Sequence, residues 1–171
     1  RTAMAIAETV KNYLVNKSVD YDLVAHAHSG SSHETAEASH VSEDHIAKGV
    51  IVKDASGYAM VIVPANNYVE MKHVRKELDR DLELVAEDEF AKLFPDCEAG
   101  AVPPLGKAYH METFLDEALT TLGYVYLEAG DHEHLVHTSG DDFNTLMSGV
   151  RHGHYSHEKS ADSFHSRTED Y

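Results

Sequence analysis

The stretch from Gly100 to Gly106, Gly-Ala-Val-Pro-Pro-Leu-Gly, constrains the fold more than any other part of the sequence. Proline fixes φ and lacks an amide proton, whereas glycine reaches backbone conformations that other residues avoid. Two prolines and two glycines in seven residues exclude a helix or a central strand here. We expect a rigid loop that Val102 and Leu105 anchor to a core. Such a loop presents main-chain carbonyl and amide groups at fixed positions.

Lys48 opens an apolar run, Lys-Gly-Val-Ile-Val, that is typical of a β-strand. An ammonium at the end of a sheet can bind a phosphate or polarise an ester carbonyl as a point charge. From the residues alone, a solvated lysine at a strand end is the simpler interpretation, and a structural proline-rich connection explains the loop equally well. Together, however, the lysine and the loop could form a small site for an anionic or ester-bearing ligand.

Length and charge limit the classes of partner. A chain of 171 residues that is 42% hydrophobic predicts one domain with a sizeable core. A net charge of −16 argues against a broad phosphate-binding surface, and no apolar run approaches the ~20 residues of a membrane span. We therefore expect neither DNA nor a membrane as partner. The single cysteine excludes an intrachain disulfide and favours a cytoplasmic location.

Periodicity and turn residues predict short helices mixed with strands, without regular βαβ alternation. The expected helices cover residues 5–16, 32–40, about 66–78 and 87–94, with a further one after Ser42 and a last one that begins at Ser139. Ser32 is the expected cap of the second helix, and Asn66 or Asn67 is the expected cap of the third. The expected strands cover residues 21–26, 47–54, 58–63, 82–85, 113–115, 124–129 and 134–138. This mixture indicates an α+β domain with a mixed or antiparallel sheet.

The order of these elements gives the chain a family resemblance. Lys48 before an apolar run, a hairpin, a helix and then Gly-x-x-x-Pro-x-Gly resembles the YbaK-type aminoacyl-tRNA deacylases, relatives of the editing domain of bacterial prolyl-tRNA synthetases. The resemblance extends over roughly Val19 to Ser148. It implies one domain over residues 5–150, with a curved, barrel-like sheet and helices packed outside. A polar, His/Ser-rich tail over residues 151–171 would follow.

The resemblance also implies roles for individual residues. Lys48 matches the lysine that nearly all members carry, and it would hold the acceptor-end phosphate or the ester carbonyl of the substrate. Gly100 and Pro104 belong to the loop that would position water and the scissile ester through main-chain contacts. Further expected substrate contacts are His28, Ser31, Gly49, Val50, Val63, Ala101, Val102, Pro103 and Gly106. Gly49 departs from the small polar residue that the family usually has.

We therefore interpret the chain as a trans-acting aminoacyl-tRNA deacylase, a hydrolase that cleaves the ester of a small amino acid on the wrong tRNA. No cofactor and no metal is expected. The partner would be the acceptor end of an aminoacylated tRNA, with a synthetase or an elongation factor as a further candidate. Two alternatives stay open, namely a non-catalytic module of the same fold that binds aminoacyl-tRNA or a synthetase, and a His-rich metal-handling protein.

The second alternative is based on 14 histidines. His26 with His28, and His132 with His134, have the spacing at which residues of a strand share a face, so each pair could supply two metal ligands. A His-Glu-x-x-His motif is absent, which favours scattered surface histidines. Two other residues have plain structural interpretations. Cys97 is expected to be a bystander thiol, and Asp116 is expected to cap a helix or to brace the loop.

Overall fold

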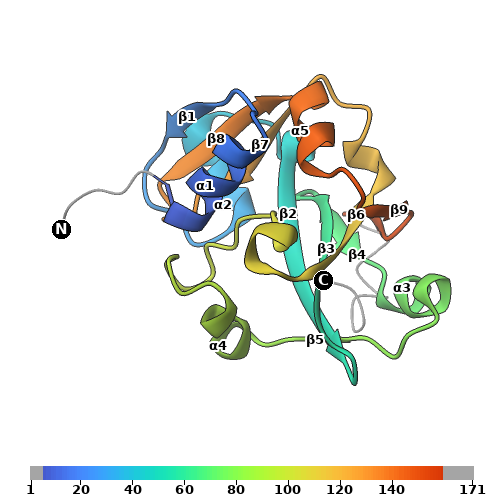
Figure 1. Cartoon of the computed structure of the whole chain (residues 1–171). Helices are drawn as coiled ribbons and strands as arrows, with labels where there is room; N and C mark the ends of the chain where they lie inside the picture. Colours follow the sequence, from blue (N-terminus) through green and yellow to red (C-terminus); the bar gives the residue numbers. More distant parts are fainter. Residues whose placement is uncertain (1–5, 160–171) are drawn as a thin grey trace.

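The computed structural model describes residues 6–159, which fold around one mixed sheet of eight strands (Figure 1). The strand order is β1-β8-β7-β2-β3-β6-β9, and β5 pairs with β2 beside this path. The strands are β1 Asp22–Ala25, β2 Ile46–Asp54, β3 Gly57–Pro64, β5 Glu83–Leu84, β6 Glu112–Asp116, β7 Tyr124–Glu128, β8 His134–Ser139 and β9 Arg151–Gly153. The pairs β2/β7, β3/β6 and β6/β9 are parallel, which confirms the predicted mixed sheet.

The β2–β3 hairpin runs through the centre of the molecule (Figure 1). Its two faces belong to two different hydrophobic clusters. Ile51, Met60 and Ile62 pack in the larger cluster, which also contains residues of the first and last helices, whereas Val50 and Val63 pack in a second cluster. Because both faces are covered, the hairpin reads as an almost continuous apolar run instead of an alternating pattern.

Within residues 6–159, five helices and four 3-10 turns surround the sheet. The helices are α1 Glu8–Asn16, α2 Ser32–Ser39, α3 Met71–Leu78, α4 Glu87–Phe90 and α5 Gly140–Leu146, and the turns are η1 Glu43–His45, η2 Ala91–Leu93, η3 Gly106–Tyr109 and η4 Glu117–Leu119. Helices α2 and α5 begin at serine caps, because the hydroxyls of Ser31 and Ser139 accept from the amides of Glu34 and Asp142. The predicted cap of α2 was Ser32, one residue later.

Two predicted helices differ from the structure. Asn66 or Asn67 was expected to cap a helix, but Asn67–Val69 forms strand β4, which pairs with β10 (Ser156–Glu158), and α3 begins only at Met71. The reason is tertiary, because the buried Asn67 side chain donates from Nδ2 to Ser156 Oγ at 2.9 Å. The helix expected after Ser42 is the single turn η1, since β2 begins at Ile46. Ala5, the predicted start of α1, lies outside the described residues.

The segment that we expected to be a polar tail contributes β9 and β10 to the fold. Asp116 holds it in place, since one carboxylate oxygen accepts from Tyr155 N at 3.0 Å and from Ser156 Oγ at 2.7 Å. The other oxygen accepts from Ala118 N at 2.9 Å, which is the predicted capping role. Asp116 thus braces the chain at residues 155–156, whereas the expected partner was the Pro/Gly loop. Residues 160–171 of the predicted tail lie outside the described residues.

No helix between residues 6 and 159 combines the length and the apolar character that crossing a membrane requires.

Candidate functional site

A cavity of about 590 Å³ lies beside the first residues of β2. Its walls come from the start of α2, from β2, from α4, from the Pro/Gly loop and from β7 and β8 with the turn between them. The lining residues are Gly30, Ser31, Ser32, His33, Thr35, Ile46, Ala47, Lys48, Gly49, Tyr68, Glu87, Phe90, Gly100, Val102, Glu128, His132, Leu135 and Lys159. Lys48 and Gly100, from the two segments that the sequence singled out, therefore meet at one cavity.

Lys48 is partly buried, and its Nζ donates to the carbonyl oxygen of Asn67 at 3.1 Å. Burial removes water from the ammonium and lowers the pKa of Lys48 to about 8, an effect that the nearby charge of Lys159 increases and that of Glu43 opposes. With that pKa, most Lys48 side chains still carry a proton at pH 7. The cavity thus contains a poorly solvated cation, which binds a phosphate or an ester carbonyl more strongly than a surface lysine does.

Gly100 has a backbone conformation that favours glycine, and the side chain of Glu87 lies close beside it. Its φ is +82°, and a Cβ atom at this position would lie 2.8 Å from Oε1 of Glu87. The loop is fixed to the turn between β7 and β8, because Glu98 N donates to Gly130 O at 2.9 Å and His132 Nε2 donates to Ala99 O at 2.8 Å. The main chain at Gly100 is therefore held open to the cavity.

Glu128, the last residue of β7, and His132, in the turn that follows it, form a polar wall of the cavity. Oε2 of Glu128 accepts from the amides of Gly130 at 2.9 Å and of His132 at 3.2 Å. Burial raises the pKa of the Glu128 carboxyl, and these backbone donors counteract that rise. Nε2 of His132 donates its proton to Ala99 O. The other ring nitrogen, Nδ1, lies 4.0 Å from Glu128 Oε1.

Five of the predicted site residues line the cavity, namely Ser31, Lys48, Gly49, Gly100 and Val102. Gly49 has a structural reason for lacking a side chain. A Cβ atom there would lie 2.9 Å from Sδ of Met60, a fully buried residue of β3. Glycine at this position therefore accommodates the core of the hairpin.

The other predicted contacts lie elsewhere among the described residues. Val50 and Val63 point into the second hydrophobic cluster, which includes α3. Ala101, Pro103 and Pro104 are buried beyond the cavity lining, and Gly106 begins η3, where it packs against Thr113 and Met60. His28 is exposed, and its Nε2 hydrogen-bonds Glu98 Oε1 at 3.1 Å. Contacts of these residues with a substrate stay predictions.

The sequence did not identify several lining residues, above all Glu87, Glu128, His132 and Lys159. Acidic residues are too frequent in this chain for any one of them to stand out, and Lys159 lies in the segment that we set apart as a tail. His132 carries one usable signal, because it occupies a polar turn between two predicted strands. Its φ of +61° is characteristic of such a turn.

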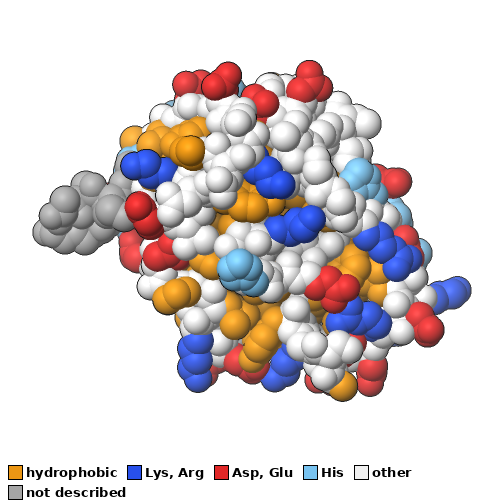
Figure 2. Space-filling view, in the orientation of Figure 1, with side chains coloured by type: hydrophobic (Ala, Val, Ile, Leu, Met, Phe, Trp, Pro, Cys, Tyr) orange, Lys and Arg blue, Asp and Glu red, His pale blue; other side chains and the backbone are white. Residues whose placement is uncertain are grey.

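Cys97 has the properties of a bystander. Burial raises the pKa of its thiol to about 12, and its recorded polar neighbours are Asp96 and Tyr109. A thiol in this state is a poor nucleophile at neutral pH. The surface charges also agree with the composition. On the face shown in Figure 2, lysine and arginine side chains lie singly among acidic and neutral residues and form no continuous basic patch.

Known structures share this fold. A structure described as a candidate trans-editing enzyme for prolyl-tRNA synthetase aligns with a TM-score of 0.76 and 18% identity, covering 94% of this chain and 100% of that one. Hypothetical protein APE2540 aligns with a TM-score of 0.77 and 21% identity, covering 88% of this chain and 100% of the other. A candidate signal transduction protein from Marinobacter aquaeolei VT8 aligns with a TM-score of 0.72 and 17% identity over 86% of this chain, which spans only 30% of that protein.

No functionally curated protein matches the chain significantly. The model of the aminoacyl-tRNA editing domain, in contrast, matches residues 26–146. That range contains most of the cavity lining, including Lys48, Gly100 and His132. The single α+β domain, its mixed sheet and this match agree with the resemblance stated above. The chain belongs to the aminoacyl-tRNA editing domain family.

Proposed function

We propose that the protein is a trans-acting deacylase that hydrolyses the ester between a small amino acid and a wrongly charged tRNA. The observation that carries this proposal is the shared cavity of Lys48 and Gly100. It combines a poorly solvated cation with an accessible, rigidly held main chain. These are the two components that binding and hydrolysing an activated ester require when no nucleophilic side chain takes part.

The ammonium groups of Lys48 and Lys159 would bind the nucleic-acid end of the substrate. Lys159 lies close enough to Lys48 to lower its pKa, and both line the cavity. Two neighbouring ammonium groups suit a phosphate of the acceptor end, and they do so without a broad basic surface. This arrangement reconciles a tRNA ligand with the net charge of −16.

The Glu87 carboxylate would bind the amino-acid end of the substrate. An aminoacyl ester carries an α-ammonium, and Glu87 lies directly beside Gly100, where the ester would be held. An ion pair between the two groups would place the ester carbonyl against the loop. A water molecule then attacks the carbonyl carbon, the oxyanion is stabilised by main-chain amides and Lys48, and the bond to the ribose oxygen breaks. The products are a free amino acid and a tRNA whose ribose hydroxyl is restored.

The apolar part of the lining sets the size of the side chain. Its larger aliphatic and aromatic hydrocarbon members are Ile46, Phe90, Val102 and Leu135. Such a pocket distinguishes side chains that differ by one methylene by only about 1–3 kcal/mol, so we expect size-based and incomplete discrimination among small amino acids. A cytoplasmic location and an additional synthetase or elongation-factor partner stay predictions.

The proposal is tested by incubating the purified protein with tRNAs charged with alanine, serine or cysteine and measuring the free amino acid released. Release of at least one of them, above the rate of spontaneous hydrolysis, is the expected result. Binding of all three charged tRNAs without release would instead identify a non-catalytic module. The competing metal-handling interpretation makes no prediction of release.

A further inference from the structure

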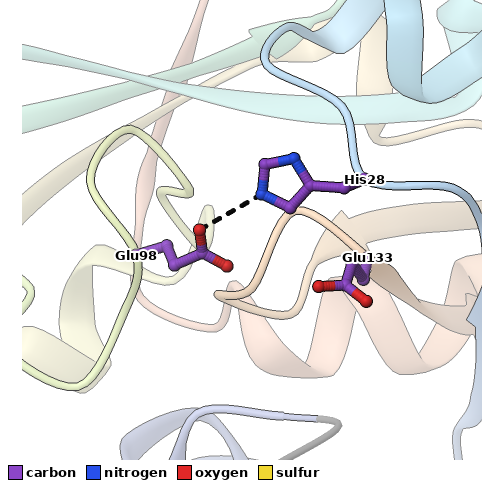
Figure 3. A group of neighbouring side chains, drawn as sticks. All are labelled: His28, Glu98 and Glu133. Carbon is purple, nitrogen blue, oxygen red and sulfur yellow. Dashed lines mark hydrogen bonds and ion pairs between the residues drawn. The ribbon is translucent and has the colours of Figure 1, made fainter. Parts of the chain in front are cut away.

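His28, Glu98 and Glu133 converge outside the cavity lining, and their side chains point into one common space (Figure 3). One donor atom from each lies within 4.8 Å of the others, and His28 Nε2 is 3.1 Å from Glu98 Oε1. The three residues come from the loop after β1, the loop before Gly100 and the turn between β7 and β8. We propose that they bind a divalent transition-metal ion of the Zn²⁺ type. This inference does not depend on the proposed function.

The spacing suits such an ion. Zinc binds imidazole nitrogen and carboxylate oxygen at about 2.0–2.2 Å, which places the ligand atoms of a tetrahedral site roughly 3.3–3.6 Å apart. The donors of this cluster, spaced between 3.1 Å for the His28–Glu98 hydrogen bond and 4.8 Å at most, need only small rotations to reach that arrangement. One imidazole and two carboxylates leave a fourth position for water. Magnesium, which prefers octahedral oxygen coordination, fits this donor set less well.

The backbone holds the three ligands at a fixed separation. Within the β7–β8 turn, Oδ1 of Asp131 accepts from the amides of Glu133 and His134, each at 2.9 Å. The segment of His28 is joined to the same turn by Ser29 N, which donates to His132 O at 3.1 Å. The segment of Glu98 is joined to it by the bond from Glu98 N to Gly130 O. A metal ion would therefore meet a site whose scaffold is already formed, which reduces the conformational entropy lost on binding.

Charge favours a cation here. Two carboxylates lie within a few ångström of each other in a strongly acidic chain, and His28 Nε2 hydrogen-bonds one of them, Glu98, at 3.1 Å. A divalent ion would neutralise both carboxylates at once. The same three segments also carry Ser31, Gly100 and His132 of the cavity lining. The ion would thus tie together the loops that form one side of the cavity, in a structural role.

This site differs from the ones that histidine spacing suggests. His132 and His134 are engaged separately, with Ala99 O at 2.8 Å and with Asp131 Oδ2 at 2.7 Å. His26 directs Nδ1 to Ala27 O at 2.7 Å. The structure therefore combines one histidine with two glutamates that are distant in sequence, which no local spacing reveals.

The test is calorimetric titration of the full chain with Zn²⁺. We expect one tightly bound ion per chain, and an affinity at least about tenfold lower in each of His28→Gln, Glu98→Gln and Glu133→Gln. His33→Gln is the matched control, because His33 also lies between two glutamates. Its Nδ1 lies 2.6 Å from Glu43 and its Nε2 lies 3.4 Å from Glu37. The two carboxylates therefore contact different ring nitrogens and do not surround one position next to a single nitrogen. Its replacement should change the affinity by less than about twofold.

Two further measurements guard against misfolded variants. X-ray absorption at the zinc edge of the unaltered protein should report one imidazole and oxygen ligands, and Zn²⁺ should raise the midpoint of thermal unfolding for the unaltered protein and His33→Gln only. Equal zinc affinity in all four variants would overturn the proposal. A spectrum with two or more imidazoles, or zinc lost on replacing His152 and His154 instead, would overturn it as well, because scattered histidines would then be the binders.

Discussion

Strand β2 carries two lysines whose surroundings are opposite. Lys53, near the hairpin turn, places Nζ 2.7 Å from Glu89 Oε2, and this hydrogen bond raises its pKa. Lys48, near the other end of the strand, donates to a neutral carbonyl, and burial lowers its pKa to about 8. Residue type and secondary structure are the same in both cases. The difference lies in the solvent and in the partner.

The comparison shows that Lys48, and not Lys53, is the lysine whose charge lowers the stability of the folded state. An ion pair at the surface adds little to stability but has no large cost, whereas the burial of an ammonium in a poorly solvated cavity has a desolvation cost that destabilises the folded state. Such a cost is expected at a site that binds an anionic or electron-rich ligand. The two ends of the β2–β3 hairpin can therefore be compared directly by substitution, one end serving as the control for the other.

The largest expected effect concerns activity at the two lysines. Lys48→Met keeps most of the side-chain stem and removes the charge, and we expect kcat/KM for deacylation to fall at least about 100-fold. Lys53→Met should change it by less than about twofold. Single-turnover release of amino acid from charged tRNA measures both. Equal losses at the two positions would mean that Lys48 has no special role.

A second comparison uses two glycines, one in the turn of the β2–β3 hairpin and one in the Pro/Gly loop beside the cavity. Gly57 in the turn and Gly100 beside the cavity both have positive φ, of +121° and +82°, but a Cβ atom meets nothing within 4 Å at Gly57 and meets Glu87 at Gly100. Alanine at either position should lower the free energy of unfolding by about 1 kcal/mol. Only Gly100→Ala should also reduce kcat/KM, by about 10- to 100-fold. Urea unfolding and deacylation assays separate the two effects, and an equal loss of activity would refute the role of the loop.

We expect Lys48→Met to have a higher free energy of unfolding than the unaltered protein at pH 7. The folded-state pKa of about 8 lies below the ordinary 10.5, so the unfolded chain binds the proton more tightly and stability rises with pH between these values. Below pH 8 the full cost of the buried charge is present. Methionine should therefore raise the free energy of unfolding at pH 7, by up to about 3 kcal/mol, and flatten its rise between pH 8 and 10.5.

Lys53→Met should act in the reverse direction. Its raised pKa means that its contribution is present below the ordinary pKa and lost as pH rises through the folded one, so the variant should be less stable than the unaltered protein at pH 7. Denaturant titrations at pH 7 and pH 10 distinguish the two variants. A destabilised Lys48→Met at pH 7 would show that the lost bond to Asn67 outweighs the burial of charge.

The smallest expected effect lies at the turn. Arg80 donates to both carboxylate oxygens of Asp54, at 2.8 and 2.9 Å, and these bonds lower the pKa of Asp54 to about 2. The stabilisation is present above the ordinary pKa of 3.8 and is lost as pH falls toward 2. Asp54→Asn should slightly lower the thermal midpoint at pH 7, approach the midpoint of the unaltered protein as pH falls toward 2 and leave deacylation unchanged. An effect of this change on activity would show that the two ends of the hairpin are coupled.

The sequence predicted the parts of the molecule that local rules determine. The apolar hairpin, the proline-glycine loop and the cap at Ser139 follow from propensity and periodicity, whereas the cap predicted at Ser32 lies at Ser31. Lys48 and Gly100 do line one cavity. Glu87 could not be found in this way, because its position beside Gly100 depends on packing between two segments. Strands β9 and β10 also gave no local signal, since they are short and polar. Tertiary contacts hold them, because β9 pairs with β6 and Ser156 of β10 bonds Asp116 and Asn67.

The attachment of the last strands has a consequence for how this domain can be transplanted. The family match ends at residue 146, yet Tyr155 is fully buried in the second hydrophobic cluster and Ser156 bonds both Asp116 and Asn67. A chain shortened to the family's limits would lose an aromatic side chain from its interior, the partners of two buried polar groups, and the ammonium of Lys159. Fusions or circular permutations of this protein should therefore keep the sequence through Lys159 intact.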